Sequence, residues 1–88
     1  MNTNNNLKFT SLEAENNYNY LYNKYNTLSI GKDELATEIY MSKSSINSYI
    51  VKGYGIPNYF KVGTSKNASV RFNIIDVAEF MSNTIKTA

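Results

Sequence analysis

Two short helices separated by only two residues, Met41 and Ser42, constrain the fold of this 88-residue chain more than any other feature. The first is predicted over Asp33 to Tyr40, where apolar residues recur on one face and acids occupy the first turn. The second is predicted over Lys43 to Lys52, with Ser42 as its N-cap and Gly53 as its stop. A shallow antiparallel pair would need a longer connection or longer helices. The sequence therefore predicts two helices that cross steeply.

The apolar residues of this segment are spaced as in DNA-binding pairs of helices. In such a unit, a small residue of the first helix has apolar positions one residue before it and three, five, ten and thirteen residues after it. With Ala36 as the small residue, every position is filled, by Leu35, Ile39, Met41, Ile46 and Tyr49. The departure is Tyr40, at a turn that commonly holds Gly because Gly takes a positive φ without strain.

Beyond Pro57 the apolar pattern changes to a period of two, which is typical of strands. Two alternating runs, residues 59–62 and 70–72, flank a polar loop at residues 63–69. They predict a β-hairpin with one cationic face and one buried face, the latter formed by Phe60, Val62, Val70 and Phe72. Asn73 is then predicted to cap a last helix from Ile74 to about Thr84.

The first 27 residues form a separate region in the prediction. Residues 1–9 are polar and are predicted to be a disordered tail. Thr10-Ser-Leu-Glu13 fits a capping box, so a Tyr-rich helical extension is expected over residues 10–27. The remaining segment, residues 28–84, would be a single domain in the order helix, tight turn, helix, hairpin, helix, which is that of a winged helix-turn-helix.

Composition removes several function classes. The chain has no Cys and no His, which excludes thiol nucleophiles, imidazole bases and zinc-finger ligands. We therefore expect no enzyme activity, no metal and no cofactor. The N-terminus does not resemble a signal peptide, and no apolar run approaches the ~20 residues of a membrane helix. A soluble, cytoplasmic protein is the default expectation.

Charge is sorted along the chain. The net charge of +2 divides into −2 for residues 1–40, +5 for residues 41–73 and −1 for residues 74–88. The middle segment has no Asp or Glu, and its cations are Lys43, Lys52, Lys61, Lys66 and Arg71. A basic stripe between acidic segments is typical of a polyanion-binding face, although five cations could also be ordinary solvated surface.

Several fragments resemble a known family in their order and spacing. They are Leu28-Ser-Ile-Gly-Lys-Asp-Glu-Leu-Ala36, Met41-Ser-Lys-Ser-Ser-Ile46, Ile50-Val-Lys-Gly53, Ile56-Pro57, Lys61-Val-Gly63, Val70-Arg-Phe72 and Asp76-Val-Ala-Glu-Phe80. Over residues 28–81 the chain resembles the phage and plasmid excisionases and the related AlpA-type regulators of the MerR-like group. The resemblance implies an α+β, mostly helical fold, a winged helix-turn-helix with a β-hairpin wing, a C-terminal helix and here an extra N-terminal helix.

The same resemblance implies a non-catalytic, sequence-specific double-stranded DNA-binding protein of a phage, plasmid or other mobile element. Such a protein acts as an excisionase-like recombination directionality factor or as a transcription regulator, with an integrase or RNA polymerase as partner. The predicted recognition-helix contacts are Lys43, Ser44, Ser45, Asn47, Ser48 and Lys52, and the predicted wing contacts are Lys61, Lys66 and Arg71.

Physical chemistry suggests roles for these residues. Asn47 can bond an adenine edge, Ser hydroxyls can bond bases or phosphates, and Val51 could meet a thymine methyl, so an A·T-leaning site is expected. This Ser/Asn face could also be plain solvated helix surface. Arg71 could contact a phosphate or a narrow minor groove, or could pair with Asp76 or Glu79.

A second function class stays open. The tyrosines between Tyr18 and Tyr25 could be core residues or a self-association surface. In that case the chain would be a protein-interaction adaptor on a winged-helix scaffold, binding through its Tyr-rich N-terminal helix. A homodimer through the same helix is compatible with either function.

Overall fold

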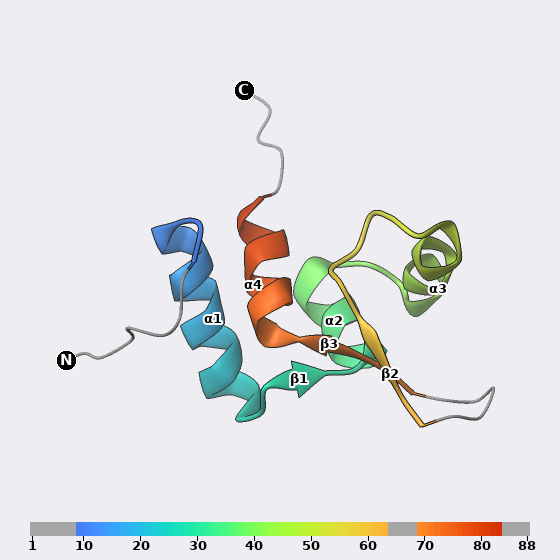
Figure 1. Ribbon diagram of the computed structural model, residues 1–88, viewed down its shortest axis with the longest axis horizontal. Coiled ribbons are helices and arrows are strands. Elements are labelled where there is room, and N and C mark those ends of the chain that lie inside the picture. The colour runs from blue at the N-terminus through green and yellow to red at the C-terminus, as the bar shows by residue number, and fades with distance from the viewer. Residues whose placement is uncertain (1–8, 64–68, 84–88) are drawn as a thin grey trace.

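The structure is a computed structural model that describes residues 9–63 and 69–83. These residues form four helices and three short strands, an α+β fold that is mostly helical (Figure 1). In chain order the elements are α1 (Leu12–Tyr25), β1 (Ser29–Ile30), α2 (Lys32–Ile39), α3 (Lys43–Lys52), β2 (Phe60–Val62), β3 (Ser69–Asn73) and α4 (Ile74–Ser82). The α+β class is confirmed, and β1 is an addition to the predicted elements. The tail predicted for residues 1–9, apart from Phe9, lies outside the described residues, as does the predicted helix end at Thr84.

The three strands form one antiparallel sheet in the order β1-β3-β2. Strand β1 is paired to β3 through Ser29 opposite Asn73 and Ile30 opposite Phe72. Two residues are too few to produce an alternating pattern, so this strand could not be predicted from the sequence. β1 nevertheless attaches the end of α1 to the central strand of the sheet.

The predicted faces of the hairpin are wrong on strand β2. Phe60 lies opposite Arg71, and Lys61 lies opposite Val70. Because opposed residues of antiparallel strands point to the same face, Phe60 shares its face with Arg71 rather than with Phe72. Phe60 is accordingly 41% exposed and Val62 is 53% exposed. A shift of the pairing register by one residue exchanges the two faces of a strand. Strand β2 has only three residues and lies at the edge of the sheet, so the core does not hold it in the predicted register.

The helix ends match the sequence signals best at α3. Helix α2 runs one residue earlier than predicted, and Asn73 occupies the N-cap position of α4 without a side-chain hydrogen bond to the helix. Ser42 caps α3 and Gly53, with φ of 85°, ends it as predicted. The cap of α1 is Ser11, whose hydroxyl accepts a hydrogen bond from the Ala14 N–H, so the prediction that Thr10 begins the capping box is wrong. The Thr10 hydroxyl and N–H donate instead to the Glu79 carboxylate on α4, a partner that local sequence cannot reveal.

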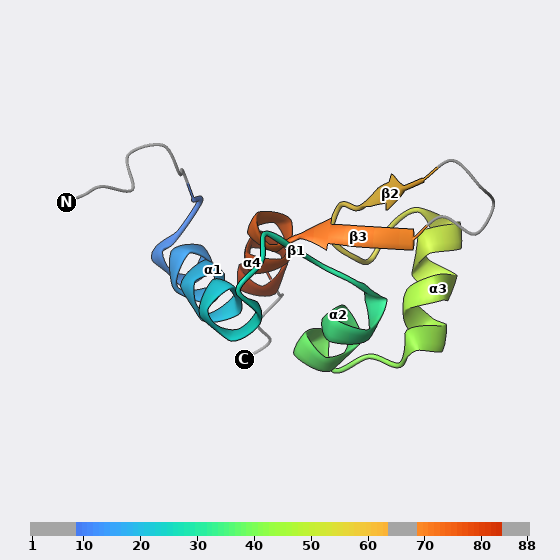
Figure 2. The same cartoon turned by 90° about the horizontal axis from the view of Figure 1, so that it is seen from below.

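Helix α1 packs along α4 and belongs to the same core as the rest of the fold (Figures 1 and 2). Leu21 of α1 is fully buried in it. The other buried members come from the sheet and the remaining helices: Ile30, Leu35, Ile46, Phe72, Ile74, Val77 and Ala78. The helix predicted as an extension to residues 28–84 is therefore part of the structure that holds α2 and α3 in place.

A buried carboxylate fastens α1 to α2. Glu38 is 8% exposed and accepts hydrogen bonds from Lys24 Nζ at 2.7 Å, from the Tyr20 hydroxyl at 3.0 Å and from the Tyr25 hydroxyl. Burial alone would raise the pKa of the Glu38 carboxyl, but the three donors outweigh burial and lower that pKa below its ordinary value. Burial and the bond to Glu38 raise the pKa of Tyr25 to about 12. The cluster thus connects the N-terminal helix to the helix that precedes α3.

Candidate nucleic-acid interface

Helix α3 is anchored at both ends and on one side. The Ser42 hydroxyl accepts from the Ser45 N–H at 3.0 Å, and the Gly53 N–H donates to the Tyr49 carbonyl at 2.8 Å. Ile46 is fully buried beneath the helix, and Ile50 packs against the core. A helix held in this way presents its opposite side in a fixed orientation.

The opposite side of α3 is exposed and carries no charge at its centre. Ser44, Asn47 and Ser48 are exposed, and Val51 is 86% exposed. Of the predicted α3 contacts, Ser45 differs from the others: it is half-buried, and its hydroxyl accepts a hydrogen bond from the Ser42 hydroxyl at 3.0 Å. Ser45 therefore contributes to the N-cap as well as to the predicted surface.

The turn before α3 uses Tyr40 in the left-handed conformation. Its φ is 59°, and the Met41 N–H donates to the Ala36 carbonyl at 3.1 Å. This is the conformation for which Gly is the easiest residue, and Tyr adopts it at a cost of about 1 kcal/mol. Tyr40 is also 94% exposed, so its ring does not recover that cost by packing within the described chain.

The three lysines of the basic segment that the structure describes are accessible. Lys43 lies 3.1 Å from Asp33, but both side chains are more than half exposed, with 57% and 76% of their surfaces accessible. An exposed pair of this kind is weak and gives way readily to another anion. Lys52 is exposed with its amine over the Tyr49 ring, and Lys61 is exposed on β2. Lys66 lies outside the described residues.

Arg71 is used inside the fold. Its Nη2 donates to the Ser29 carbonyl at 2.7 Å and its Nε donates to the Ser29 hydroxyl at 3.2 Å, so the guanidinium ties β1 to β3. The alternative ion pair with Asp76 or Glu79 does not form among the described residues. Register places Arg71 and Lys61 on opposite faces of the hairpin. The structure therefore does not bring the two together on the single cationic face that the sequence predicted.

Within the described ranges, no three carboxylates lie close enough to hold a metal ion together. Nor does any helix there have the length and apolar character needed to cross a membrane. Comparisons of the chain with protein-family models, with curated proteins and with solved structures found no match.

Proposed function

We propose that this chain is a non-catalytic, sequence-specific double-stranded DNA-binding protein, in which α2 and α3 act as a helix-turn-helix and the β2–β3 hairpin acts as a wing. One observation carries the proposal. A rigidly anchored helix exposes an uncharged Ser/Asn/Val face between Lys43 and Lys52, inside a 33-residue segment, Met41 to Asn73, that contains no acid.

The exposed face has the chemistry of major-groove recognition. Asn47 can form two hydrogen bonds with an adenine edge, and Ser44 and Ser48 can bond base edges or phosphates. Val51, near the C-terminal end of the face, can contact a thymine methyl group. No Arg is available on α3 to read guanine. The target site is therefore expected to be rich in A·T pairs.

Phosphate contacts are assigned to lysines. Lys43, Lys52 and Lys61 are exposed, whereas Arg71 is bonded to Ser29; Lys66 is added from the sequence alone. If each lysine neutralises one phosphate, the plot of log K against log salt has a slope of about −3.6, from about −0.9 per phosphate. Including Arg71 would give about −4.5.

The biological role within this class rests on the resemblance of the sequence fragments. An excisionase-like recombination directionality factor would assemble with an integrase, whereas a transcription regulator would engage RNA polymerase. Both roles use the same DNA-binding surface, so the proposal covers both. Stimulation of excision by an integrase encoded beside this gene would select the first role.

The alternative function, a protein-interaction adaptor that binds through α1, receives less support. Tyr20 and Tyr25 donate to Glu38, and Tyr18 packs against the core. These side chains serve the fold, which leaves the 41%-exposed Tyr22 as the main candidate contact among them. Light scattering of the full chain and of Tyr22→Ser tests this function, because self-association lost in the variant would favour it.

Selection of bound sites from random duplex DNA tests the proposed function. We expect a short A·T-rich consensus and, on the selected duplex, a salt slope near the value for four phosphates. Recovery of unrelated sequences, with equal affinity for selected and scrambled duplexes, would contradict sequence-specific binding. DNA affinity that does not change with salt concentration would contradict the proposed contacts between lysines and phosphates.

A further inference from the structure

The loop that joins α3 to β2 carries a hollow of its own. The loop runs from Gly53 to Tyr59, between the helix and the hairpin that we assign to DNA binding (Figure 1). The hollow measures about 330 Å³, and its walls include the side chains of Tyr54, Asn58 and Tyr59. Two of these side chains end in a hydroxyl group and one ends in an amide. The hollow is therefore lined by groups that can donate hydrogen bonds.

The backbone of this loop is held in place. Gly53 and Gly55 adopt positive φ values of 85° and 88°. A Cβ atom on Gly55 would lie 2.7 Å from the Tyr49 ring, so the backbone at Gly55 packs closely against that ring. Further along, Ile56 packs against the core and Pro57 is buried. The loop thus presents its side chains from a fixed backbone, as α3 does.

The Tyr54 ring is supported by a neighbour, whereas its hydroxyl is free. The ring lies 6.3 Å from the Tyr49 ring in an edge-on arrangement, with 61° between the two planes. The Lys52 amine lies 5.3 Å from the centre of the same Tyr49 ring. Tyr54 is nevertheless 65% exposed, and its hydroxyl has no hydrogen-bond partner among the described residues. One half-buried ring therefore supports an exposed ammonium group and an exposed phenol at the end of α3.

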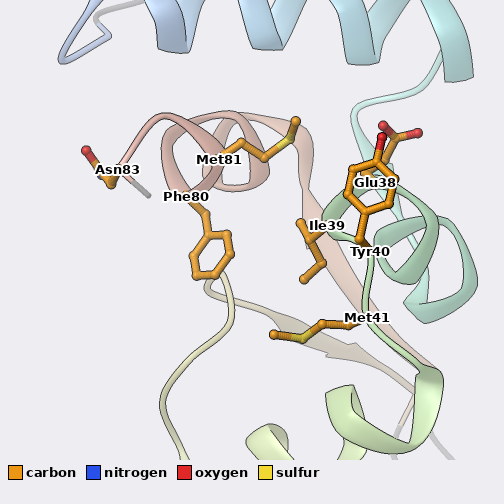
Figure 3. Close-up of a pocket in the computed structure, with 7 residues that line it drawn as sticks. All are labelled: Glu38, Ile39, Tyr40, Met41, Phe80, Met81 and Asn83. Carbon is orange, nitrogen blue, oxygen red and sulfur yellow. The ribbon is translucent and has the colours of Figure 1, made fainter. Parts of the chain in front are cut away.

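The charges around the loop suit an anion. Lys52 precedes the loop and Lys61 follows it, and both are exposed. The surrounding segment, Met41 to Asn73, contains no Asp or Glu. A larger groove of about 620 Å³ between α2 and α4 differs in character, because its walls are mostly apolar with the carboxylate of Glu38, and no described Lys or Arg lines it (Figure 3). An anionic ligand is therefore favoured at the loop and disfavoured at the groove.

DNA phosphates match the donors of the loop. Phosphate oxygens in protein–DNA complexes accept hydrogen bonds from Tyr and Asn side chains as well as from Lys and Arg. A neutral donor adds affinity without releasing a counterion, because it brings no charge to replace the condensed cation. An anionic lipid surface is a poorer match, since the neighbouring face of α3 exposes Asn and Ser side chains that hydrocarbon cannot satisfy.

We propose that the loop from Gly53 to Tyr59 binds the DNA backbone beside α3, with the Tyr54 hydroxyl and the Asn58 amide donating hydrogen bonds to phosphate oxygens. This site rests on the proposed DNA-binding function and adds to it a phosphate contact that carries no charge. Lys52 and Lys61 attract the backbone from either end of the loop, while the two neutral donors fix its position. The contact has no base preference, so it strengthens binding to every duplex.

The test is a titration of labelled duplex DNA, followed by fluorescence anisotropy over a salt series, with the selected duplex and its scrambled counterpart. Tyr54→Phe removes only the hydroxyl and keeps the ring against Tyr49, so it should fold. It should weaken binding to both duplexes by about fivefold, the value of one hydrogen bond, without changing the salt slope. Asn58→Ala should have the same effect. Lys52→Ala should instead reduce the magnitude of the slope by about 0.9. The matched control is Tyr22→Phe on α1, an exposed tyrosine outside the basic segment, which should bind DNA as the parent does.

Three results would overturn this site and leave the proposed function intact. If the parent binds the selected duplex and Tyr54→Phe binds it equally tightly at every salt concentration, the hydroxyl makes no contact. A loss confined to the selected duplex would place Tyr54 on a base edge instead of a phosphate. A smaller slope in Tyr54→Phe would assign the loss to a displaced lysine. Failure of the parent to bind either duplex would instead contradict the proposed function, and this site with it.

Discussion

Replacing Arg71 separates its structural role from a role in DNA binding. In the fold, the guanidinium donates two hydrogen bonds to Ser29 and joins the N-terminal strand β1 to the central strand β3. Arg71→Met keeps much of the aliphatic stem and removes both donors. The Ser29 carbonyl and hydroxyl then lose their partner, and β1 is held to β3 only by its backbone pairing and by Ile30.

The expected loss of stability follows from these two bonds. A hydrogen bond from a charged donor contributes about 1.5–3 kcal/mol in proteins. Because the Arg71 side chain is only half-buried and both of its bonds go to one residue, we expect about 2 kcal/mol for the pair rather than the sum of two full contributions. For a domain of this size, 1 kcal/mol corresponds to about 4–8 °C in Tm, so Arg71→Met should lower Tm by about 8–16 °C.

Thermal and urea unfolding followed by circular dichroism provide the assay. Arg71→Lys is the matched control: it keeps the charge but cannot reproduce the two-pronged contact, so it should recover no more than about half of the loss. At a temperature where both variants are folded, the salt slope of DNA binding should be unchanged. A Tm loss below about 2 °C, together with a slope that is smaller by about 0.9, would refute the structural role and assign Arg71 to a phosphate.

Further predictions concern the buried cluster and the end of α3. The pKa of Glu38 is lower in the folded state than its ordinary value of 4.5. The stability that Glu38 provides is therefore present above pH 4.5 and is lost as pH falls below that value. Glu38→Gln should flatten this part of a stability–pH profile. The pKa of Tyr25 is raised to about 12, so stability should fall as pH rises from 10 to 12, and Tyr25→Phe should remove part of that fall. Gly53 and Gly55 have φ of 85° and 88°, but a Cβ on Gly55 would lie 2.7 Å from the Tyr49 ring, whereas one on Gly53 would meet nothing within 4 Å. Gly55→Ala should therefore destabilise the protein by about 1 kcal/mol more than Gly53→Ala does in urea unfolding, and equal losses would show that the Tyr49 ring moves aside freely.

Local signals were sufficient to predict α3 and its surroundings. The Ser42 cap, the apolar period and Gly53 lie within twelve residues of one another, and each acts on neighbouring backbone groups. The exposed positions of Asn47 and Val51 follow from the same helical period. The exposed face of α3 was therefore predictable from the sequence, whereas its contact with DNA stays a prediction.

Long-range pairings were not predictable in the same way. The register of β2 depends on which residues of β3 it meets, and alternation alone is compatible with either face. The partner of Arg71 is Ser29, 42 positions away in a two-residue strand. Likewise, Thr10 bonds Glu79, and Glu38 gathers its donors from α1. The sequence contained these polar residues but not the pairs that they form.

The central claim is that the uncharged face of α3 reads DNA sequence while lysines supply affinity without reading it. The most direct measurement is the ratio of affinities for the selected duplex and a scrambled duplex, determined for the parent chain, Asn47→Ala and Lys61→Ala at one salt concentration. We predict that Asn47→Ala lowers the discrimination free energy, RT ln of this ratio, by about 1–3 kcal/mol, the value of one bidentate base contact. Lys61→Ala should weaken binding to both duplexes equally and leave the ratio unchanged. An unchanged ratio in Asn47→Ala would contradict the claim.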